Sequence, residues 1–318
     1  MPNFDHFLQE QGFVILDGAL ATELEARGAN LNHSLWSSKL LNENPALIKE
    51  VHLDYLKSGA NAIATASYQA SFIGFEKQGY TKEEAIDLMK LSVDIATDAR
   101  TSFLLNSLNK TKYFPLVAAS LGPYGAALAD GSEYRGYNGK VSVSDLIHFH
   151  EERLKVMINT QADVLAFETI PCLDEAIAIK ELLHKYPTKN AWVSFSCKDG
   201  LHLSSGELFE DAVKLLSDSN EIIGIGVNCT APQHIESLVK IAVPLTQKII
   251  MVYPNKGETY NAVTKEWETV EGCHPNFVEN AKIWINAGAR AIGGCCRTNP
   301  RDIQELGELT LNKNQFIN

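Results

Sequence analysis

The sequence has no uninterrupted apolar stretch long enough to cross a bilayer, which takes about 20 residues in a helix. Its first residues also lack the basic segment and apolar run that mark a secretory signal. We therefore expect no membrane partner and a cytoplasmic location.

Clusters of basic residues are missing too. The chain has 28 Lys and Arg against 39 Asp and Glu, which gives a formal net charge of −11. Binding to nucleic acid or to an anionic membrane needs a concentrated positive field. The charge balance therefore argues against nucleic acid as a partner and favours small molecules.

No linker rich in Pro and Ser and no low-complexity segment divides the chain. Its 318 residues and 45% hydrophobic content suit one large core, and single α/β barrels are typical of this size. We expect one domain over residues 1–318, while the oligomeric state has no signal in the sequence.

Cysteine is scarce, with six residues. In a reducing compartment these are expected to be thiols or metal ligands and not a disulfide framework.

Short apolar runs bounded by turn residues recur along the chain, and helical patterns lie between them. Asn44 with Pro45, and Thr81 with Glu84, are typical helix starts. Strands that alternate with helices form parallel sheets, and eight such units predict one closed (β/α)8 TIM barrel. The expected strands span residues 13–16, 60–64, 116–120, 164–167, 191–196, 222–227, 249–252 and 290–292.

Polar and sulfur-containing side chains follow most of these strands. In (β/α)8 barrels the chemistry lies at the C-terminal ends of the strands, so these side chains are the candidates for a site. They are Asp17, Ser67, Glu168, Asn228, Cys229, Asn255, Cys295 and Cys296.

The adjacent thiols Cys295 and Cys296 come directly after two glycines. Glycines let the backbone bend, so both sulfurs can face one point. Neighbouring cysteines strain a mutual disulfide, and a soft metal such as zinc is the better use for the pair, although free cysteine is also typical of a core. Zinc binds four tetrahedral ligands. Cys229 is the expected third ligand and Cys197 its main rival, whereas Cys172 and Cys273 fit less well.

Three thiolates leave one tetrahedral position open, as in a catalytic zinc site. Coordination lowers the pKa of a thiol, so the open position suits a substrate thiol. Asp17 and Glu168 are placed to bind an ammonium group, and backbone N–H groups around Gly18 and Ala19 suit a carboxylate. An amino-acid thiol would satisfy all of these groups together.

These acidic residues also have structural alternatives. The Asp17-Gly18 pair is a common turn, and Glu168 could instead be the internal partner of Arg135 or Arg297.

The aromatic and imidazole candidates are weaker. Trp36 is more typical of a core than of a site. His148 and His150 lie two positions apart on a predicted helix, so they point to different faces, and we reject them as a metal pair.

Seven stretches together make the chain similar to the zinc-dependent homocysteine S-methyltransferases, specifically the short type that uses S-methylmethionine or S-adenosylmethionine. The combination of Asn-Cys with Gly-Gly-Cys-Cys-Arg-Thr is highly specific, and the matches run nearly end to end. They are residues 16–24, 67–70, 129–136, 167–169, 226–229, 252–255 and 293–298.

The resemblance implies that zinc-bound homocysteine thiolate attacks the methyl group of a sulfonium, giving methionine. It implies one zinc ion per chain on Cys229, Cys295 and Cys296. S-methylmethionine is the expected donor and S-adenosylmethionine a slower one. The grounds are the loop at residues 129–136, which resembles that of the S-methylmethionine-using type, and the ring face of Trp36, which could stabilise a cationic donor. That loop could instead be a lid that only excludes water. The expected substrate-binding residues are Asp17, Gly18, Trp36, Ser67, Glu168 and Asn228.

The chain departs from the betaine-using relatives at Gln69 and Thr169, where they have tyrosine. We also expect no cobalamin- or folate-binding extension after residue 318, so betaine and folate are not expected as donors. Two other classes stay open: a zinc hydrolase on the same barrel, which normally uses histidine and carboxylate ligands, and a thiol or zinc-binding protein without turnover.

Overall fold

The computed structural model describes residues 4–33, 35–106, 113–261, 266–269 and 276–311. Its centre is an eight-stranded parallel sheet with the strand order β1-β10-β7-β6-β5-β4-β3-β2. The strands are β1 (Val14–Ile15), β2 (Ala62–Ala64), β3 (Leu116–Leu121), β4 (Val164–Ile170), β5 (Ala191–Phe195), β6 (Ile222–Asn228), β7 (Ile249–Tyr253) and β10 (Ala291–Ile292).

The two outer strands of this order meet and close the sheet into a barrel. Leu16 forms a parallel bridge with Ala62. Backbone hydrogen bonds run from Asp17 N–H to the Ala62 carbonyl at 3.1 Å and from Asn61 N–H to the Ile15 carbonyl at 2.7 Å. The predicted (β/α)8 barrel and each of its eight predicted strands are therefore confirmed.

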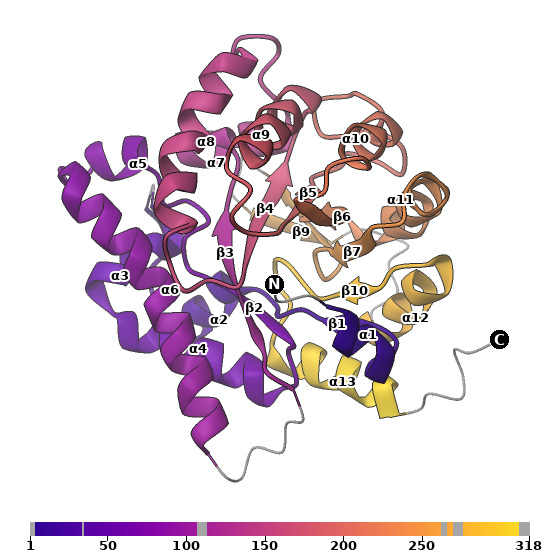
Figure 1. Cartoon of the computed structure of the whole chain (residues 1–318). Coiled ribbons are helices and arrows are strands. Elements are labelled where there is room, and N and C mark those ends of the chain that lie inside the picture. Colours follow the sequence, from indigo (N-terminus) through magenta and orange to yellow (C-terminus); the bar gives the residue numbers. More distant parts are fainter. Residues whose placement is uncertain (1–3, 34, 107–112, 262–265, 270–275, 312–318) are drawn as a thin grey trace.

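Helices surround the strands, as Figure 1 shows. The longer ones follow the strands in order: α4 (Pro45–Lys57), α6 (Lys82–Leu105), α8 (Val143–Met157), α9 (Leu173–Lys185), α10 (Phe209–Leu216), α11 (Ile235–Ala242), α12 (Phe277–Ala287) and α13 (Pro300–Leu311). The predicted helix starts are confirmed, since the Asn44 side chain accepts the Leu47 N–H and Thr81 forms a capping box with Glu84.

Several short elements lie where the sequence suggested only loops. They are α1 (Asp5–Gln11), α2 (Leu20–Ala26), the 3-10 helix η1 (Trp36–Lys39), α3 (Leu40–Glu43), α5 (Phe72–Glu76), α7 (Tyr124–Leu128), the 3-10 helix η2 (Ser132–Tyr134), η3 (Pro232–His234), η4 (Val243–Leu245) and the antiparallel hairpin β8 (Glu258–Asn261) with β9 (Glu266–Thr269). Helices of one or two turns and strands of four residues are too short to give a clear periodic pattern, which is why the sequence did not predict these elements.

Helix α1 closes the N-terminal end of the barrel. Phe4 and Phe7 pack with interior strand residues such as Val14 and Trp192 in one buried cluster, and the rings of Phe4 and Trp192 are 6.2 Å apart. Trp192 lies near the start of β5. With this end filled, a substrate is expected at the opposite end, where the strands finish.

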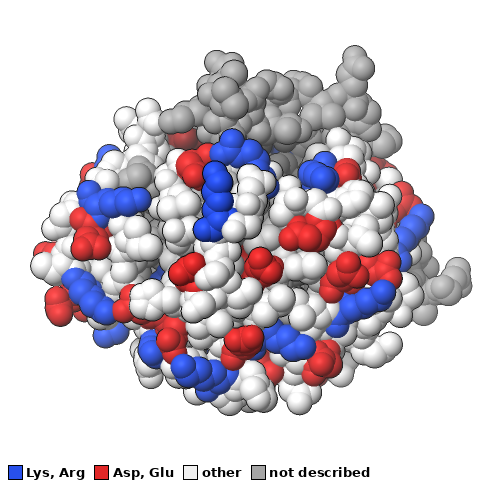
Figure 2. Space-filling model, turned by 90° about the horizontal axis from the view of Figure 1, so that it is seen from above, with Lys and Arg blue, Asp and Glu red and all other residues white. Residues whose placement is uncertain are grey.

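Charged side chains are scattered over the outer surface (Figure 2). On the face shown in Figure 2, described acidic and basic residues are mixed, without a continuous basic patch. Among the described residues, none of the helices is both long enough and apolar enough to pass through a membrane.

Candidate metal and substrate site

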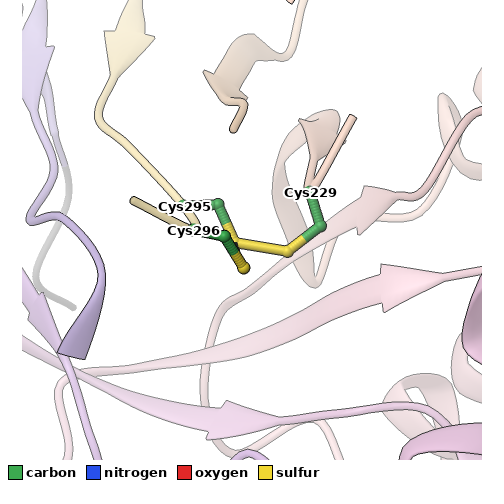
Figure 3. A group of neighbouring side chains, drawn as sticks. All are labelled: Cys229, Cys295 and Cys296. Carbon is green, nitrogen blue, oxygen red and sulfur yellow. Dashed lines mark hydrogen bonds between the residues drawn. A yellow bond between two sulfur atoms is a disulfide. The ribbon is translucent and has the colours of Figure 1, made fainter. Parts of the chain in front are cut away.

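Three cysteines converge at the C-terminal end of the barrel, one after β6 and two after β10 (Figure 3). The end of β7 lies between them and holds both segments. The carbonyl of Tyr253 accepts Cys229 N–H at 3.3 Å, and that of Pro254 accepts Cys295 N–H at 2.8 Å. Cys229 has a left-handed backbone with φ of +46°, an uncommon conformation for a residue with a side chain.

The two glycines before the cysteine pair permit close backbone packing. A Cβ atom at Gly293 would lie 2.6 Å from the Asp17 carbonyl oxygen, and one at Gly294 would lie 2.3 Å from the Thr298 hydroxyl oxygen. Side chains cannot fit at these distances, so glycine is needed to bring Cys295 against β1 and β7.

The sulfur atoms of Cys229, Cys295 and Cys296 all lie within 4.8 Å of one another, and those of Cys295 and Cys296 are 4.0 Å apart. Tetrahedral zinc with Zn–S bonds of about 2.3 Å sets its sulfur ligands about 3.8 Å apart. Burial raises the pKa of the Cys296 thiol to about 12, and a bound cation would favour its ionised form. Spacing and ligand type therefore fit a metal ion.

Cys229 and Cys295 are joined by a disulfide in this structure, with Cα atoms 5.5 Å apart (Figure 3). The sequence predicts thiols or metal ligands, and the structure instead joins this one pair, while their role as metal ligands stays a prediction. The reason is the convergence of two strand ends that are 66 residues apart in the sequence, which spacing alone does not reveal. A disulfide sulfur is not a thiolate ligand, so disulfide and metal site are alternative states of the same two residues.

The other cysteines lie elsewhere. Cys172 and Cys197 are free and buried, and burial raises the pKa of both thiols far above the usual range. Cys197 belongs to the hydrophobic core and is not in the group of three converging sulfurs. Cys273 lies outside the described residues.

Glu168 and Asp17 lie at the same end of the barrel as the cysteines. Glu168 is buried and accepts a hydrogen bond from the Ser120 hydroxyl, and burial raises its pKa to about 7. Asp17 accepts the Ala64 N–H at 2.8 Å. Burial, together with the nearby charge of Glu168, raises the pKa of Asp17 well above its usual value. Two acids whose charges repel one another favour binding of a cation.

The structural alternatives for Glu168 fit less well. Its polar contacts are hydroxyl groups, from Ser120 and Tyr253. The guanidinium of Arg135 donates instead to the Asp130 carbonyl at 2.6 Å, and Arg297 lies near the carboxylate of Glu25.

Asn228 is buried and fully engaged with neighbouring strands. Its Oδ1 accepts Thr169 N–H at 2.7 Å and the Ser194 hydroxyl at 2.9 Å, while its Nδ2 donates to the Thr169 hydroxyl at 2.8 Å. Thr169 is left-handed, with φ of +63°. Asn228 therefore holds Thr169, the residue after Glu168, and itself directly precedes Cys229.

Two further predicted substrate residues have partners inside the protein. The Ser67 hydroxyl donates to the Ser120 carbonyl at 2.8 Å. At Gly18, a Cβ would lie 2.9 Å from the ring of Tyr55. The neighbouring Ala19 N–H donates to the Thr298 hydroxyl at 3.1 Å, so this donor is already used within the chain.

Trp36 is half-buried and contacts Tyr68 edge to face, with ring centroids 6.1 Å apart. Asn255 is buried, and its Oδ1 has no hydrogen-bond partner among the described residues. The rejected histidines do lie on different faces, because His148 is exposed whereas His150 is buried and contacts Glu175 at 2.8 Å.

Sequence reasoning missed three residues of this end. Tyr253 is the last residue of β7, and its hydroxyl accepts the Trp192 indole N–H at 3.0 Å. Burial and then the charge of Glu133 raise the pKa of the Tyr68 phenol well above its usual value, and the charges of Glu168 and Cys296 act on it too. Tyr68 therefore lies among these groups. Tyr68, Glu133 and Tyr253 all stood in the stretches that carried the family resemblance, which was the available signal.

Comparisons with known proteins agree with this geometry. The family model described as homocysteine S-methyltransferase matches residues 14–310. The homocysteine S-methyltransferase YbgG of Bacillus subtilis strain 168 is 50% identical over 309 residues, which cover 96% of this chain and 97% of the relative.

Two crystal structures of the homocysteine methyltransferase MmuM from Escherichia coli share the fold. The metallated form has a TM-score of 0.85 at 42% identity, and the oxidized form has a TM-score of 0.85 at 41% identity. Each alignment covers 96% of this chain and 99% of the other. By its match to the family model and by its close relatives over nearly the full length, the chain belongs to the homocysteine S-methyltransferase family.

Proposed function

We propose that this protein transfers a methyl group from a sulfonium donor to homocysteine and so forms methionine, with one zinc ion held by Cys229, Cys295 and Cys296. The observation that carries the proposal is the convergence of these three sulfurs within 4.8 Å at the C-terminal end of the barrel. The group contains cysteine alone, which favours a thiol-binding site over the histidine and carboxylate sets usual in zinc hydrolases. S-methylmethionine is the proposed main donor and S-adenosylmethionine a slower one.

Zinc in such a site would lower the pKa of a coordinated substrate thiol and keep it ionised at neutral pH. Three protein ligands leave one tetrahedral position for that thiol. The cysteine segments are fixed by backbone hydrogen bonds to the end of β7, so the position of the nucleophile is set by the barrel and not by a mobile loop.

Asp17 and Glu168 would hold the ammonium group of homocysteine. Both are acidic, both lie at the C-terminal end of the barrel, and the charge of Glu168 raises the pKa of Asp17. An ammonium between them relieves that repulsion and favours the ionised form of both acids. Ser120 and Asn228 keep Glu168 and the following residue in place. Homocysteine would thereby be oriented with its sulfur toward the three cysteines.

Methyl transfer from a sulfonium requires no general base at the carbon, because the leaving group departs as a neutral thioether. The residues of this site would act by holding the two substrates so that both sulfurs and the methyl carbon lie in line, and such alignment can supply several kcal/mol, up to roughly 7–11 kcal/mol.

A comparison of initial rates tests the proposal. Reduced, zinc-loaded protein would be given homocysteine with S-methylmethionine, S-adenosylmethionine, betaine or methyltetrahydrofolate. The proposal expects the highest rate with S-methylmethionine and a lower one with S-adenosylmethionine. A betaine or folate rate above both sulfonium rates would refute the donor assignment, and no transfer from any donor would refute the function.

A further inference from the structure

Glu133 is an acidic residue that the account above leaves without a role. It lies in η2, in the loop that follows β3 and α7. Turn hydrogen bonds stabilise this loop: Asp130 accepts the Ser132 N–H at 2.9 Å, and the Ser132 carbonyl accepts the Gly136 N–H at 2.8 Å.

The backbone of Glu133 is fixed to the barrel. Its carbonyl accepts a hydrogen bond at 2.8 Å from the hydroxyl of Ser196, which is buried and directly follows β5. On the other side α7 packs against it so closely that a Cβ atom at Gly125 would lie 2.5 Å from Glu133 N. The side chain therefore starts from a fixed point at the C-terminal end of the barrel.

The carboxyl group of Glu133 lacks a full set of hydrogen-bond and charge partners in the described part of the chain. Its Oε2 is buried and has no hydrogen-bond partner among the described residues. Burial raises its pKa, the carboxylate of Asp130 raises it further, and the guanidinium of Arg135 and a backbone hydrogen bond oppose the shift. The same guanidinium donates to the Asp130 carbonyl. A buried carboxylate oxygen without a hydrogen-bond partner is costly, and a bound cation would remove that cost.

The backbone of Glu133 lies at the same end of the barrel as the substrate site. The phenol of Tyr68 interacts with the charges of Glu133, Glu168 and Cys296, so it lies near both the unexplained acid and the proposed homocysteine site. The Tyr68 ring in turn contacts Trp36 at 6.1 Å. Aromatic rings next to a carboxylate suit a cation that has no N–H groups to donate.

We propose that Glu133 binds the sulfonium group of the methyl donor, with Tyr68 and Trp36 as the aromatic wall beside it. This inference rests on the proposed function. During transfer the bond between the donor sulfur and the methyl carbon breaks, and its electron pair stays on that sulfur. The homocysteine sulfur forms the new bond to carbon. The donor thereby loses its positive charge beside Glu133, which favours release of the thioether product.

Glu133→Gln tests this role because it removes the charge and keeps the volume. The matched control is Glu236→Gln, which makes the same charge change on the surface of α11, where Glu236 pairs with Lys240 at 2.6 Å. Binding of S-methylmethionine to reduced, zinc-loaded protein would be measured by calorimetry, together with steady-state kinetics, zinc content and thermal unfolding.

We expect Glu133→Gln to weaken S-methylmethionine binding and raise its KM by roughly tenfold to a hundredfold, as for loss of a charged contact. The homocysteine KM, zinc content and unfolding temperature should stay near wild type, kcat should change little, and Glu133→Asp should recover part of the affinity. Glu236→Gln should match wild type in every measurement. Wild-type affinity and KM for the donor in Glu133→Gln would overturn the inference while leaving the proposed function intact.

A second ligand separates the two charges of the donor, since S-methylmethionine carries an ammonium as well as a sulfonium. Dimethylsulfoniopropionate has the sulfonium without the ammonium, and its binding should weaken in Glu133→Gln by a similar factor. Weakened binding of S-methylmethionine alone, or no binding of dimethylsulfoniopropionate to wild type, would overturn the sulfonium assignment. Wild type that neither binds nor uses any sulfonium would refute the proposed function itself.

Discussion

Buried acids dominate the chemistry of this site at the scale of single residues. Glu168 has neutral hydroxyl partners, and burial raises its pKa to about 7. Burial also raises the pKa of Asp17, and repulsion from the charge of Glu168 raises it further. Ionisation of these acids is unfavourable until a cation binds, and the ammonium group of a substrate supplies that cation. The site should therefore prefer amino acids over simple thiols.

Replacing Glu168 with Gln should therefore weaken homocysteine binding. Loss of a hydrogen bond to a charged group costs roughly 1.5–3 kcal/mol, which raises the homocysteine KM by about tenfold or more. Zinc content should be unchanged, because Glu168 is not among the three converging ligands. An unchanged KM measured at saturating donor would count against this role.

The homocysteine KM of wild type should also depend on pH. Burial raises the pKa of the Glu168 carboxyl to about 7. As pH falls through this value the acid becomes neutral and loses its attraction for ammonium, so the KM should rise on the acid side. The Glu168→Gln variant serves as the control for titration of the substrate thiol. An inflection of equal size in both proteins would exclude Glu168 as its source.

The disulfide between Cys229 and Cys295 predicts a requirement for reductant. Metal ligands must be free thiolates, so protein with this bond intact should bind little zinc and show no methyl transfer. Treatment with a reductant, followed by zinc, should restore both. The measurement is zinc per chain against the number of free thiols. One tightly bound zinc per chain with the disulfide intact would contradict the proposed ligand set.

At the scale of elements, glycines control how closely β6 and β7 approach each other. Gly226 pairs with Met251 in the sheet, and a Cβ atom at Gly226 would lie 2.0 Å from the Met251 carbonyl oxygen. Because β6 ends in Asn228 and leads into Cys229, any shift of this strand also moves a proposed zinc ligand.

Gly226→Ala should therefore destabilise the protein. Overpacking of a well-packed interior typically costs about 1–3 kcal/mol, and this contact is with backbone that cannot rotate away. The control is Gly307→Ala in α13, where the nearest atom is 3.8 Å away and alanine favours the helix by up to about 1 kcal/mol. Denaturant unfolding of both variants would show the difference, and equal stability of the two would refute this view of the β6–β7 contact.

At the scale of the whole molecule, the barrel could be predicted because its strands are buried on both faces. Runs such as residues 13–16 and 222–227 read as continuous apolar segments between helical patterns. Counting eight of them gave the architecture, and the rule that chemistry lies at strand ends then selected Asp17, Glu168 and the cysteines. The structure brings the three predicted sulfurs together, while their role as zinc ligands stays a prediction.

Other parts of the site depend on contacts that spacing does not encode. Cys197 and Cys229 both follow strands, and only the folded chain shows one in the core and the other beside Cys295. Ser67 was a reasonable candidate by position, yet its hydroxyl bonds a neighbouring strand. Glu133 reaches this end through a loop fixed by β5 and α7, which no local pattern predicts.

The pairing of β6 and β10 on either side of β7 creates the proposed metal centre, because it brings together Cys229 and Cys295, which are 66 residues apart in the sequence. The most direct test of this account is the zinc content and methyl-transfer rate of four reduced variants, Cys229→Ala, Cys295→Ala, Cys296→Ala and, as the control, Cys197→Ala. We predict that each of the first three loses zinc and activity, while Cys197→Ala keeps both. Full zinc retention in all three, or loss of zinc only in Cys197→Ala, would contradict it.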